Sequence, residues 1–169
     1  MRASAGRVTL LSVATLAVQI STDKLPPGVK ADRVVVIKSK RLLMLEKEGK
    51  VLKAYRVALG GHPVGPKTQE GDSKTPEGHY RLDSRNANSK FYRSIHVSYP
   101  NASDAAAARK RGVRPGGAIM IHGLPREWAW VGKLHVATDW TDGCIAVSNE
   151  EMDEIWRAVS DGTPIDIQP

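Results

Sequence analysis

The stretch 33–59, RVVVIKSKRLLMLEKEGKVLKAYRVAL, decides the fold class. Its aliphatic and β-branched runs at 33–38 and 41–46 are typical of strands. A third run, 51–59, follows the turn Glu48–Gly49–Lys50. Short turns of this kind join neighbouring antiparallel strands. The domain is therefore expected to begin with a three-stranded antiparallel meander.

The rest of the chain is also rich in strand patterns. Residues 60–78 alternate glycine with proline and predict a long structured loop, and 124–140 holds three tryptophans without a clear period and is expected to be a loop over the site. Asn101 or Ser103 can cap one helix and Ser148 another. The remaining predicted elements are strands at 79–83, 93–99, 118–122 and 164–167 and helices at 102–111 and 149–159. We expect a mainly β fold, a β-rich sandwich or partly closed barrel with a few short helices.

Composition favours one exported domain. The chain has 169 residues with 41% hydrophobic content, which is enough for a single core. Its net charge of +7 comes from scattered basic residues. They form no stripe and accompany no nucleic-acid motif, so the sequence predicts a basic surface facing an anionic wall or membrane and no nucleic-acid partner.

The amino-terminal residues resemble an export signal. Arg2 and Arg7 precede an apolar run at 8–20, the length of a signal-peptide core. We therefore expect residues 1–20 to be a signal peptide or a membrane anchor, 21–32 a linker and 33–169 the catalytic domain. This organisation predicts export to the periplasm or cell envelope, with cleavage and anchoring both open.

Cys144 is the only cysteine and follows Gly143 in a turn. A lone thiol outside an apolar run suggests a nucleophile. Its pKa is ordinarily about 8.5, and lowering it by roughly two units is worth about 2.7 kcal/mol. His122 ends a predicted strand before Gly123, so its imidazole is the expected proton acceptor and later donor. The backbone N–H groups of Gly143 and Cys144 are the expected oxyanion donors.

Two separated motifs carry a family resemblance. Ile121–His122–Gly123 followed by Thr141–Asp142–Gly143–Cys144 resembles the paired signature of L,D-transpeptidase (YkuD-type) catalytic domains. Residues 65–67, 70–72 and 75–78 are similar to that family's preceding loop, and the similarity runs from about 34 to 167. The resemblance implies a mainly β catalytic fold, Cys144 as nucleophile and His122 as proton carrier. It also implies a peptidoglycan stem peptide as acyl donor at diaminopimelate, with no metal and no cofactor.

Three departures from the family pattern leave the second half of the reaction open. Asp142 stands where the family usually has histidine, Ala146 where it has arginine or asparagine, and the interval between His122 and Thr141 is long and rich in tryptophan. The acyl acceptor is then a second stem peptide, a lipoprotein, a free amino acid or water. Transfer would make this an L,D-transpeptidase, whereas hydrolysis would make it an amidase or L,D-carboxypeptidase.

Four further residues are assigned to substrate binding: Gly123, Thr141, Asp142 and His135. Asp142 either orients an imidazole or a substrate ammonium group, or bonds its own backbone in the turn. His135 is either a second imidazole of the site or a residue of the covering loop. His96, in a strand of alternating character, is expected to pack or bond within the fold.

Two other classes remain as alternatives. A metal-dependent hydrolase would use His96, His122 and His135 with Asp139 or Asp142, although no zinc-site spacing is present. A non-catalytic wall-binding module would grip glycan or peptide with the tryptophans and the glycine-rich loop, and its cysteine would be incidental.

Overall fold

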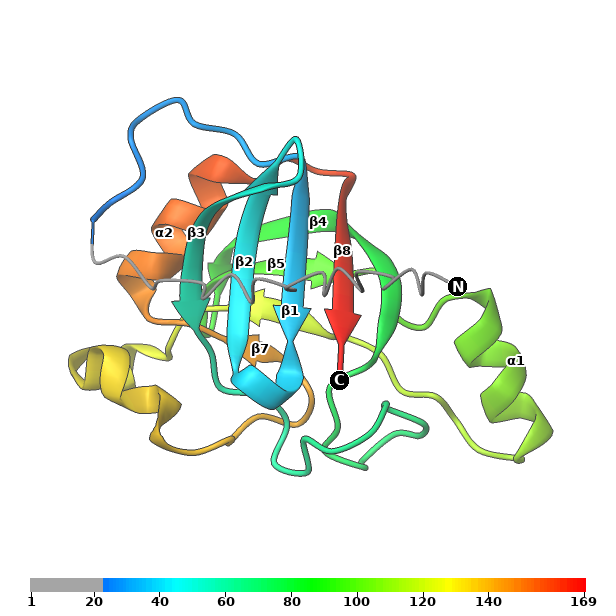
Figure 1. Ribbon diagram of the computed structural model, residues 1–169. Helices are drawn as coiled ribbons and strands as arrows, with labels where there is room; N and C mark the ends of the chain where they lie inside the picture. The colour runs from blue at the N-terminus through cyan, green and yellow to red at the C-terminus, as the bar shows by residue number, and fades with distance from the viewer. Residues whose placement is uncertain (1–22) are drawn as a thin grey trace, which may run out of the picture.

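A computed structural model describes residues 23–169 as one strongly curled sheet with helices at its margins (Figure 1). Two α-helices, α1 (Ala102–Lys110) and α2 (Asn149–Ala158), and two stretches of 3-10 turns, η1 (Lys38–Lys40) and η2 (Arg126–Ala137), accompany it. The strands are β1 (Arg33–Ile37), β2 (Leu42–Lys47), β3 (Lys50–Arg56), β4 (Gly78–Ser89), β5 (Tyr92–Val97), β6 (Met120–His122), β7 (Ile145–Ala146) and β8 (Thr163–Gln168).

The sheet has the order β3-β2-β1-β8-β4-β5-β6-β7 over the described residues. The pairs β1–β8 and β6–β7 are parallel and the others antiparallel. In Figure 1 the strands β3, β2, β1 and β8 form a front layer, and β4 and β5 curl behind it. The mainly β, partly closed barrel is thus confirmed, as is the meander of β1, β2 and β3.

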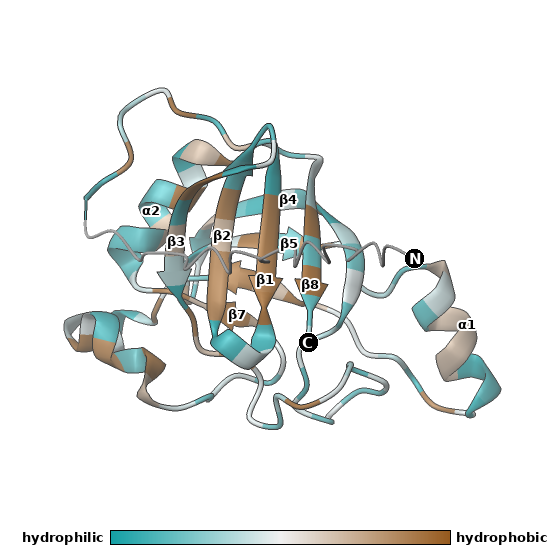
Figure 2. Cartoon of the chain, viewed as in Figure 1, coloured by the Kyte–Doolittle hydropathy of each residue, from teal (hydrophilic) through white to brown (hydrophobic). Residues whose placement is uncertain are grey.

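The core lies inside the curl. Val34 and Val36 of β1 and Leu43 and Leu45 of β2 belong to it, whereas the intervening Val35 and Met44 are buried in a second, smaller cluster. Figure 2 shows apolar residues concentrated on the central strands and polar residues on the turns. Because successive side chains of a strand point to opposite faces, the continuous apolar runs of β1 and β2 supply buried side chains to both faces of the sheet.

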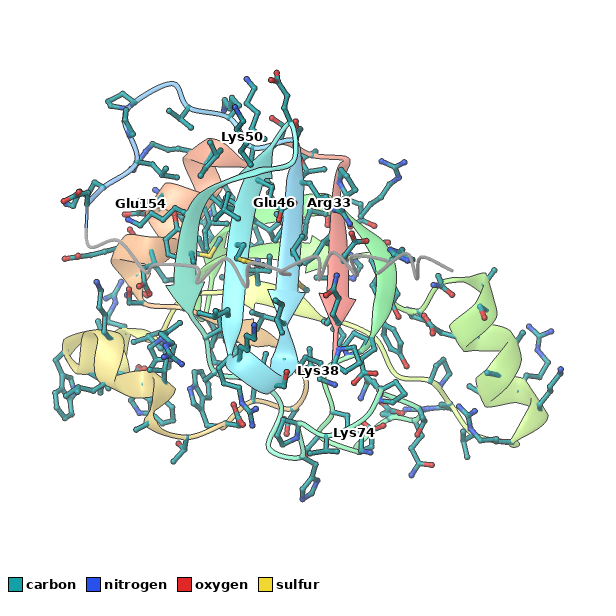
Figure 3. The ribbon with its side chains drawn as sticks, in the orientation of Figure 1. Arg33, Lys38, Glu46, Lys50, Lys74 and Glu154 are labelled. Atoms are coloured by element: carbon teal, nitrogen blue, oxygen red, sulfur yellow. The ribbon has the colours of Figure 1, made fainter. Side chains whose placement is uncertain are left out.

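Helix α2 lies beside β3 at the open side of the curl (Figure 1). Ser148 begins it with a capping box in which its side chain accepts from the Glu151 N–H. Glu154, labelled in Figure 3, is buried and pairs with the buried Lys53 of β3 at 2.7 Å. This helix therefore joins the front layer to the segment that contains Cys144.

The short elements β7 and η1 were not predicted, and two further segments differ from the sequence predictions in extent or type. Strand β4 continues to Ser89, beyond the predicted end at 83, since its polar residues pair with β5 through two register shifts. The expected loop 124–140 contains 3-10 turns interrupted at Gly132, whose φ is 51°. Neither feature has an apolar period, so backbone pairing and local turns decide them.

The predicted signal peptide or anchor at 1–20 lies outside the described residues. In the predicted linker, residues 23–30 contain turns and no helix or strand. Ala31 is already buried, and its N–H donates to the Ala158 carbonyl at 2.9 Å. Within residues 23–169, no helix is long and apolar enough to cross a membrane.

Candidate active site

The parallel pairing of β6 and β7 brings His122 and Cys144 to one cavity. Residue His122 pairs with Ala146, and the Val147 N–H donates to the His122 carbonyl at 3.0 Å. Cys144 directly precedes β7. Both side chains line a cavity of about 600 Å³. The two residues that the sequence predicted as nucleophile and base therefore share one space.

His122 is held as a neutral base. Its ring is buried, and Nδ1 lies 2.7 Å from the Gly123 carbonyl oxygen. A carbonyl can only accept, so Nδ1 carries the hydrogen and Nε2 is left as the proton acceptor. Phe91 stacks on the ring at 4.5 Å between centroids, and burial lowers the pKa of His122 below its usual value.

The thiol of Cys144 is half-buried and donates to the Ala118 carbonyl at 3.6 Å. Burial raises its pKa, and the neighbouring Asp142 carboxylate raises it further. The expectation of a lowered thiol pKa is therefore wrong, because burial disfavours the charged thiolate. Thiol and imidazole are both neutral at pH 7.

Thr141 stabilises the turn that contains Cys144. Its hydroxyl accepts from the Gly143 N–H at 3.1 Å and donates to the Cys144 carbonyl at 2.8 Å. Gly143 has a φ of 130°, and a Cβ there would lie 2.5 Å from the Lys74 carbonyl. Glycine is thus required by backbone and space. The Gly143 N–H is used inside the turn, which leaves the Cys144 N–H as the expected oxyanion donor.

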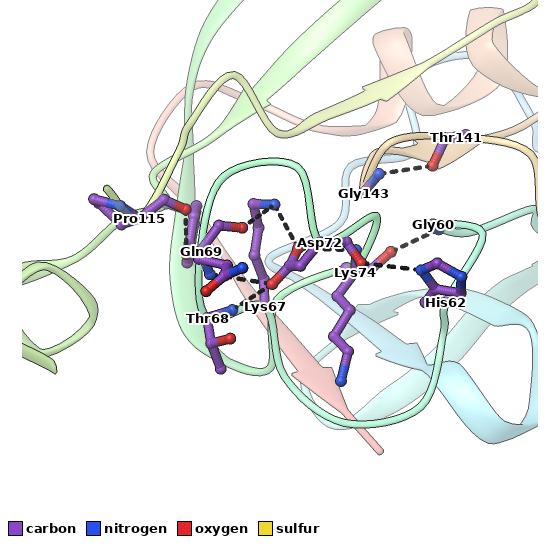
Figure 4. Close-up of polar contacts among 12 residues, drawn as sticks. Gly60, His62, Lys67, Thr68, Gln69, Asp72, Lys74, Pro115, Thr141 and Gly143 are labelled. Atoms are coloured by element: carbon purple, nitrogen blue, oxygen red, sulfur yellow. Dashed lines mark hydrogen bonds and ion pairs between the residues drawn. The ribbon is translucent and has the colours of Figure 1, made fainter. Parts of the chain in front are cut away.

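The loop 60–77 lies beneath this turn (Figure 4). Asp72 organises it by accepting from the Lys67 ammonium at 2.8 Å and from the backbone N–H groups of Thr68, Gln69 and Lys74. Burial raises the pKa of Asp72, but these donors outweigh it and bring the pKa to about 2. The loop that resembled the family pattern is therefore a scaffold for the Gly143–Cys144 backbone.

Lys38, which follows β1, holds that loop by hydrogen bonds (Figure 3). Its side chain is 2% exposed, and Nζ donates to the carbonyls of Gly65 and Thr75 at 2.7 and 2.9 Å and to the Glu77 carboxylate at 2.8 Å. Sequence reasoning assigned Lys38 only to a strand, because its partners lie far along the chain. The ammonium group therefore holds the loop 60–77 in place next to the turn that contains Cys144.

We predict that Lys38→Met destabilises the protein by about 3 kcal/mol, since it leaves the half-buried Glu77 carboxylate and two carbonyls without their cation. The matched control is Lys40→Met, because Lys40 is exposed and belongs to the same turn. Urea unfolding of both variants measures the difference. Equal stability of the two variants would show that the loop does not depend on this ammonium group.

His135 belongs to residues 124–140, the covering segment. It is not among the residues that line the cavity shared by His122 and Cys144, the catalytic cavity. It is buried, and its ring lies 6.5 Å from that of Trp140, which itself lies 5.8 Å from His122. Burial lowers the pKa of His135 to about 4, with a smaller contribution from His122. Of the two roles considered for His135, the geometry supports the covering one.

This buried imidazole predicts acid-sensitive stability. Between pH 6.5 and about 4 the unfolded state protonates His135 and the folded state does not, so stability falls as pH drops through that window. The loss attributable to His135 is on the order of 3 kcal/mol. Urea unfolding at pH 7 and pH 4.5 should show a smaller loss for His135→Phe than for the native protein. Identical losses would mean that His135 is protonated in the folded state.

The other predicted site residues have distinct positions. The Asp142 carboxylate is exposed and lines the catalytic cavity. The hydrogen bonds to the backbone of the turn, which were one of the two roles considered for Asp142, are made by the Thr141 hydroxyl. Gly123 is buried in packing: a Cβ there would lie 2.5 Å from Asn149 Oδ1. The predicted role of His96 within the fold is confirmed, because its Nδ1 lies 2.7 Å from Asp83 Oδ1.

The described residues offer no donor set for the metal-dependent hydrolase. No three histidine, cysteine or acidic side chains in residues 23–169 lie close enough to hold a metal ion. Asp139, one of the considered ligands, accepts from the Arg41 guanidinium at 2.7 Å and from the Leu59 N–H at 3.0 Å. Asp139 therefore links the meander and the residue Leu59 that follows it to the covering segment by hydrogen bonds.

Sequence reasoning missed the tip of the β4–β5 hairpin. Ser89, Lys90 and Phe91 all line the catalytic cavity, and Phe91 covers the base. Phe91 is the only phenylalanine of the chain, but no spacing links it to the two motifs. Its role depends on the unpredicted extension of β4.

Comparison with known proteins agrees with this geometry. Residues 31–167 match the YkuD family, described as the L,D-transpeptidase catalytic domain. YafK from Escherichia coli (strain K12), which its name assigns provisionally to the L,D-transpeptidases, is 30% identical over 112 residues, 65% of this chain and 38% of YafK.

Solved structures show the same fold. Pgp2 from Campylobacter jejuni, a helical cell shape determining protein, superposes with a TM-score of 0.62 at 26% identity, covering 87% of this chain and 51% of Pgp2. An L,D-transpeptidase from Xylanimonas cellulosilytica gives a TM-score of 0.51 at 18% identity, covering 85% of this chain and 63% of that one. The chain thus spans about half the length of Pgp2 and less than half that of YafK.

Proposed function

Because this chain belongs to the L,D-transpeptidase (YkuD) catalytic domain family, we propose that it modifies peptidoglycan by acyl transfer through Cys144. The acyl donor is a stem peptide that reacts at its diaminopimelate carbonyl. The observation that carries the proposal is the shared cavity, in which the Cys144 thiol accompanies an imidazole whose tautomer is fixed by the Gly123 carbonyl.

The first half of the reaction forms a thioester. Cys144 Sγ attacks the carbonyl carbon while its proton passes to His122 Nε2, which avoids a free thiolate in a site that raises the thiol pKa. The Cys144 N–H stabilises the oxyanion. As the tetrahedral intermediate collapses, the C–N bond breaks and the imidazolium gives its proton to the leaving amine.

The second half returns the thiol. An acceptor amine attacks the thioester carbonyl, the new C–N bond forms, the C–S bond breaks, and the amine proton reaches sulfur through His122. With water in place of the amine, the same steps give a free acid. The exposed Asp142 carboxylate at the cavity is suited to bind an ammonium group of either peptide.

Hydrolysis is the second candidate outcome. Ala146, which stands where the family usually carries arginine or asparagine, is fully buried and exchanges backbone hydrogen bonds with Ala58. It therefore supplies no polar group to hold an acceptor, and Asp142 replaces the usual histidine nearby. Both departures favour an amidase or L,D-carboxypeptidase, with the same acyl-enzyme, as the alternative to cross-linking.

Mass spectrometry of the reaction tests the proposal. The full chain is mixed with purified disaccharide-tetrapeptide, and both the intact protein and the muropeptides are weighed over time. We expect a transient adduct on Cys144 together with a cross-linked dimer or a shortened monomer, the former indicating transfer and the latter hydrolysis. Protein alkylated beforehand with iodoacetamide is the control. Absence of adduct and of product change would exclude the proposed activity.

The proposed substrate lies outside the cytoplasmic membrane, so this function requires export. The basic and apolar pattern of residues 1–20 supports a signal peptide or anchor. Cell fractionation of the tagged full chain tests this point, and retention in the cytosol would contradict it.

A further inference from the structure

A second cavity adjoins the catalytic one. It has a volume of about 670 Å³, and Ser89 and Lys90 at the β4–β5 hairpin tip line both cavities. Its other lining residues come from the strand ends next to that tip, from the start of the covering segment and from the first residue of α2. Arg93, Arg126 and Asn149 are among them. None of these residues was assigned a function by the motifs.

The charged residues that line this second cavity are all cationic: Lys90, Arg93 and Arg126. Arg93 is paired with Asp153 at 2.9 Å. Within residues 23–169, neither Lys90 nor Arg126 forms an ion pair. By contrast, the lining of the catalytic cavity includes the Asp142 carboxylate as well as Lys90. Lys90 and Arg126 therefore give the second cavity positive charge that no carboxylate of its own lining compensates.

Asn149, a neutral polar residue of the lining, also carries hydrogen-bond donors. Asn149 Oδ1 accepts from the Leu124 N–H at 2.7 Å, which orients the amide and leaves its NH₂ group as the available part. A guanidinium, an ammonium and an amide NH₂ thus line one cavity, and its remaining polar side chains, Asn88, Ser89 and Tyr92, are neutral. A carboxylate matches this set because it only accepts, and an arginine can bind both of its oxygens.

We propose that this cavity is a recognition subsite for a free carboxylate of a stem peptide, with Arg126 and Lys90 as its specificity-determining residues. The inference rests on the proposed function for the identity of the peptide. Lys90 lines both cavities, so a peptide can place its carboxylate in the second cavity while its reacting group lies beside Cys144. The subsite discriminates free carboxylates from amidated ones, since an amide carries no charge and presents its own donors.

Direct binding to an unreactive protein tests the subsite separately from the chemistry. Calorimetry measures Kd for the tripeptide L-Ala–γ-D-Glu–diaminopimelate and for its fully amidated form, using the full chain with Cys144→Ala. We expect the amidated peptide to bind about tenfold more weakly. Adding Arg126→Gln should weaken binding of the free peptide by a similar factor and leave the amidated peptide unaffected.

The matched control is Lys110→Gln, which removes one exposed cation from the remote helix α1. Arg126 is exposed, so its substitution should not change the melting temperature. Lys90→Gln should act in the same direction as Arg126→Gln. Equal affinity for free and amidated peptides, no binding of either, or equal effects of Arg126→Gln and Lys110→Gln would overturn the subsite. Failure of the proposed function would instead appear as absent turnover by the native protein, whether or not binding depends on Arg126.

Discussion

A Cys144→Ala protein is expected to turn over no muropeptide above background, a loss on the order of 10⁴-fold or more in kcat. The methyl group cannot form the thioester through which both halves of the proposed reaction pass. Product mass spectra of native and variant protein under identical conditions measure the loss. Turnover by Cys144→Ala at the native rate would exclude a cysteine mechanism.

The fold should survive this substitution, which makes the result interpretable. The thiol is half-buried and makes one weak sulfur hydrogen bond to Ala118, so the loss in stability should be about 1 kcal/mol. The turn is held instead by the two hydrogen bonds of the Thr141 hydroxyl. A native melting profile with absent activity would assign the effect to the nucleophile.

Local patterns explain which elements the sequence predicted. The meander of β1, β2 and β3 follows from apolar and β-branched runs and a short turn, and Ser148 marks the start of α2 by its own hydrogen bond. The insertion of β8 between β1 and β4 depends on contacts between residues more than 80 positions apart. No local pattern contains that pairing. The extension of β4 was missed because its polar residues pair through backbone groups alone.

In the candidate site, too, the sequence predicted the residues that stand in local motifs and missed those that act through tertiary contacts. Cys144 and His122 stand in recognisable motifs, so their residue types were enough to predict a nucleophile and a base. The direction of the Cys144 pKa was predicted wrongly because it depends on burial, which a motif does not contain. Lys38 and Phe91 were missed since each acts on the site through tertiary contacts.

His122→Gln is expected to lower kcat about 10³-fold, because the raised thiol pKa leaves little thiolate at pH 7 without a base. Glutamine keeps a side chain of similar length that can still donate to the Gly123 carbonyl, but it cannot take the proton. The matched control is His96→Gln, since His96 bonds Asp83 away from the catalytic cavity. Activity should be native in that control.

The pH dependence separates a base from a merely structural histidine. Because burial lowers the pKa of His122, the native acid limb of kcat/KM should lie below pH 6.5, where the imidazole becomes protonated and can no longer accept. In His122→Gln that limb should disappear, and the residual rate should rise with pH as the thiolate fraction grows. Iodoacetamide alkylation of Cys144, followed by intact mass across pH 5 to 9, offers the same comparison without substrate. If His122→Gln keeps the native acid limb, another group is the base, and the fixed tautomer at Gly123 serves only the fold.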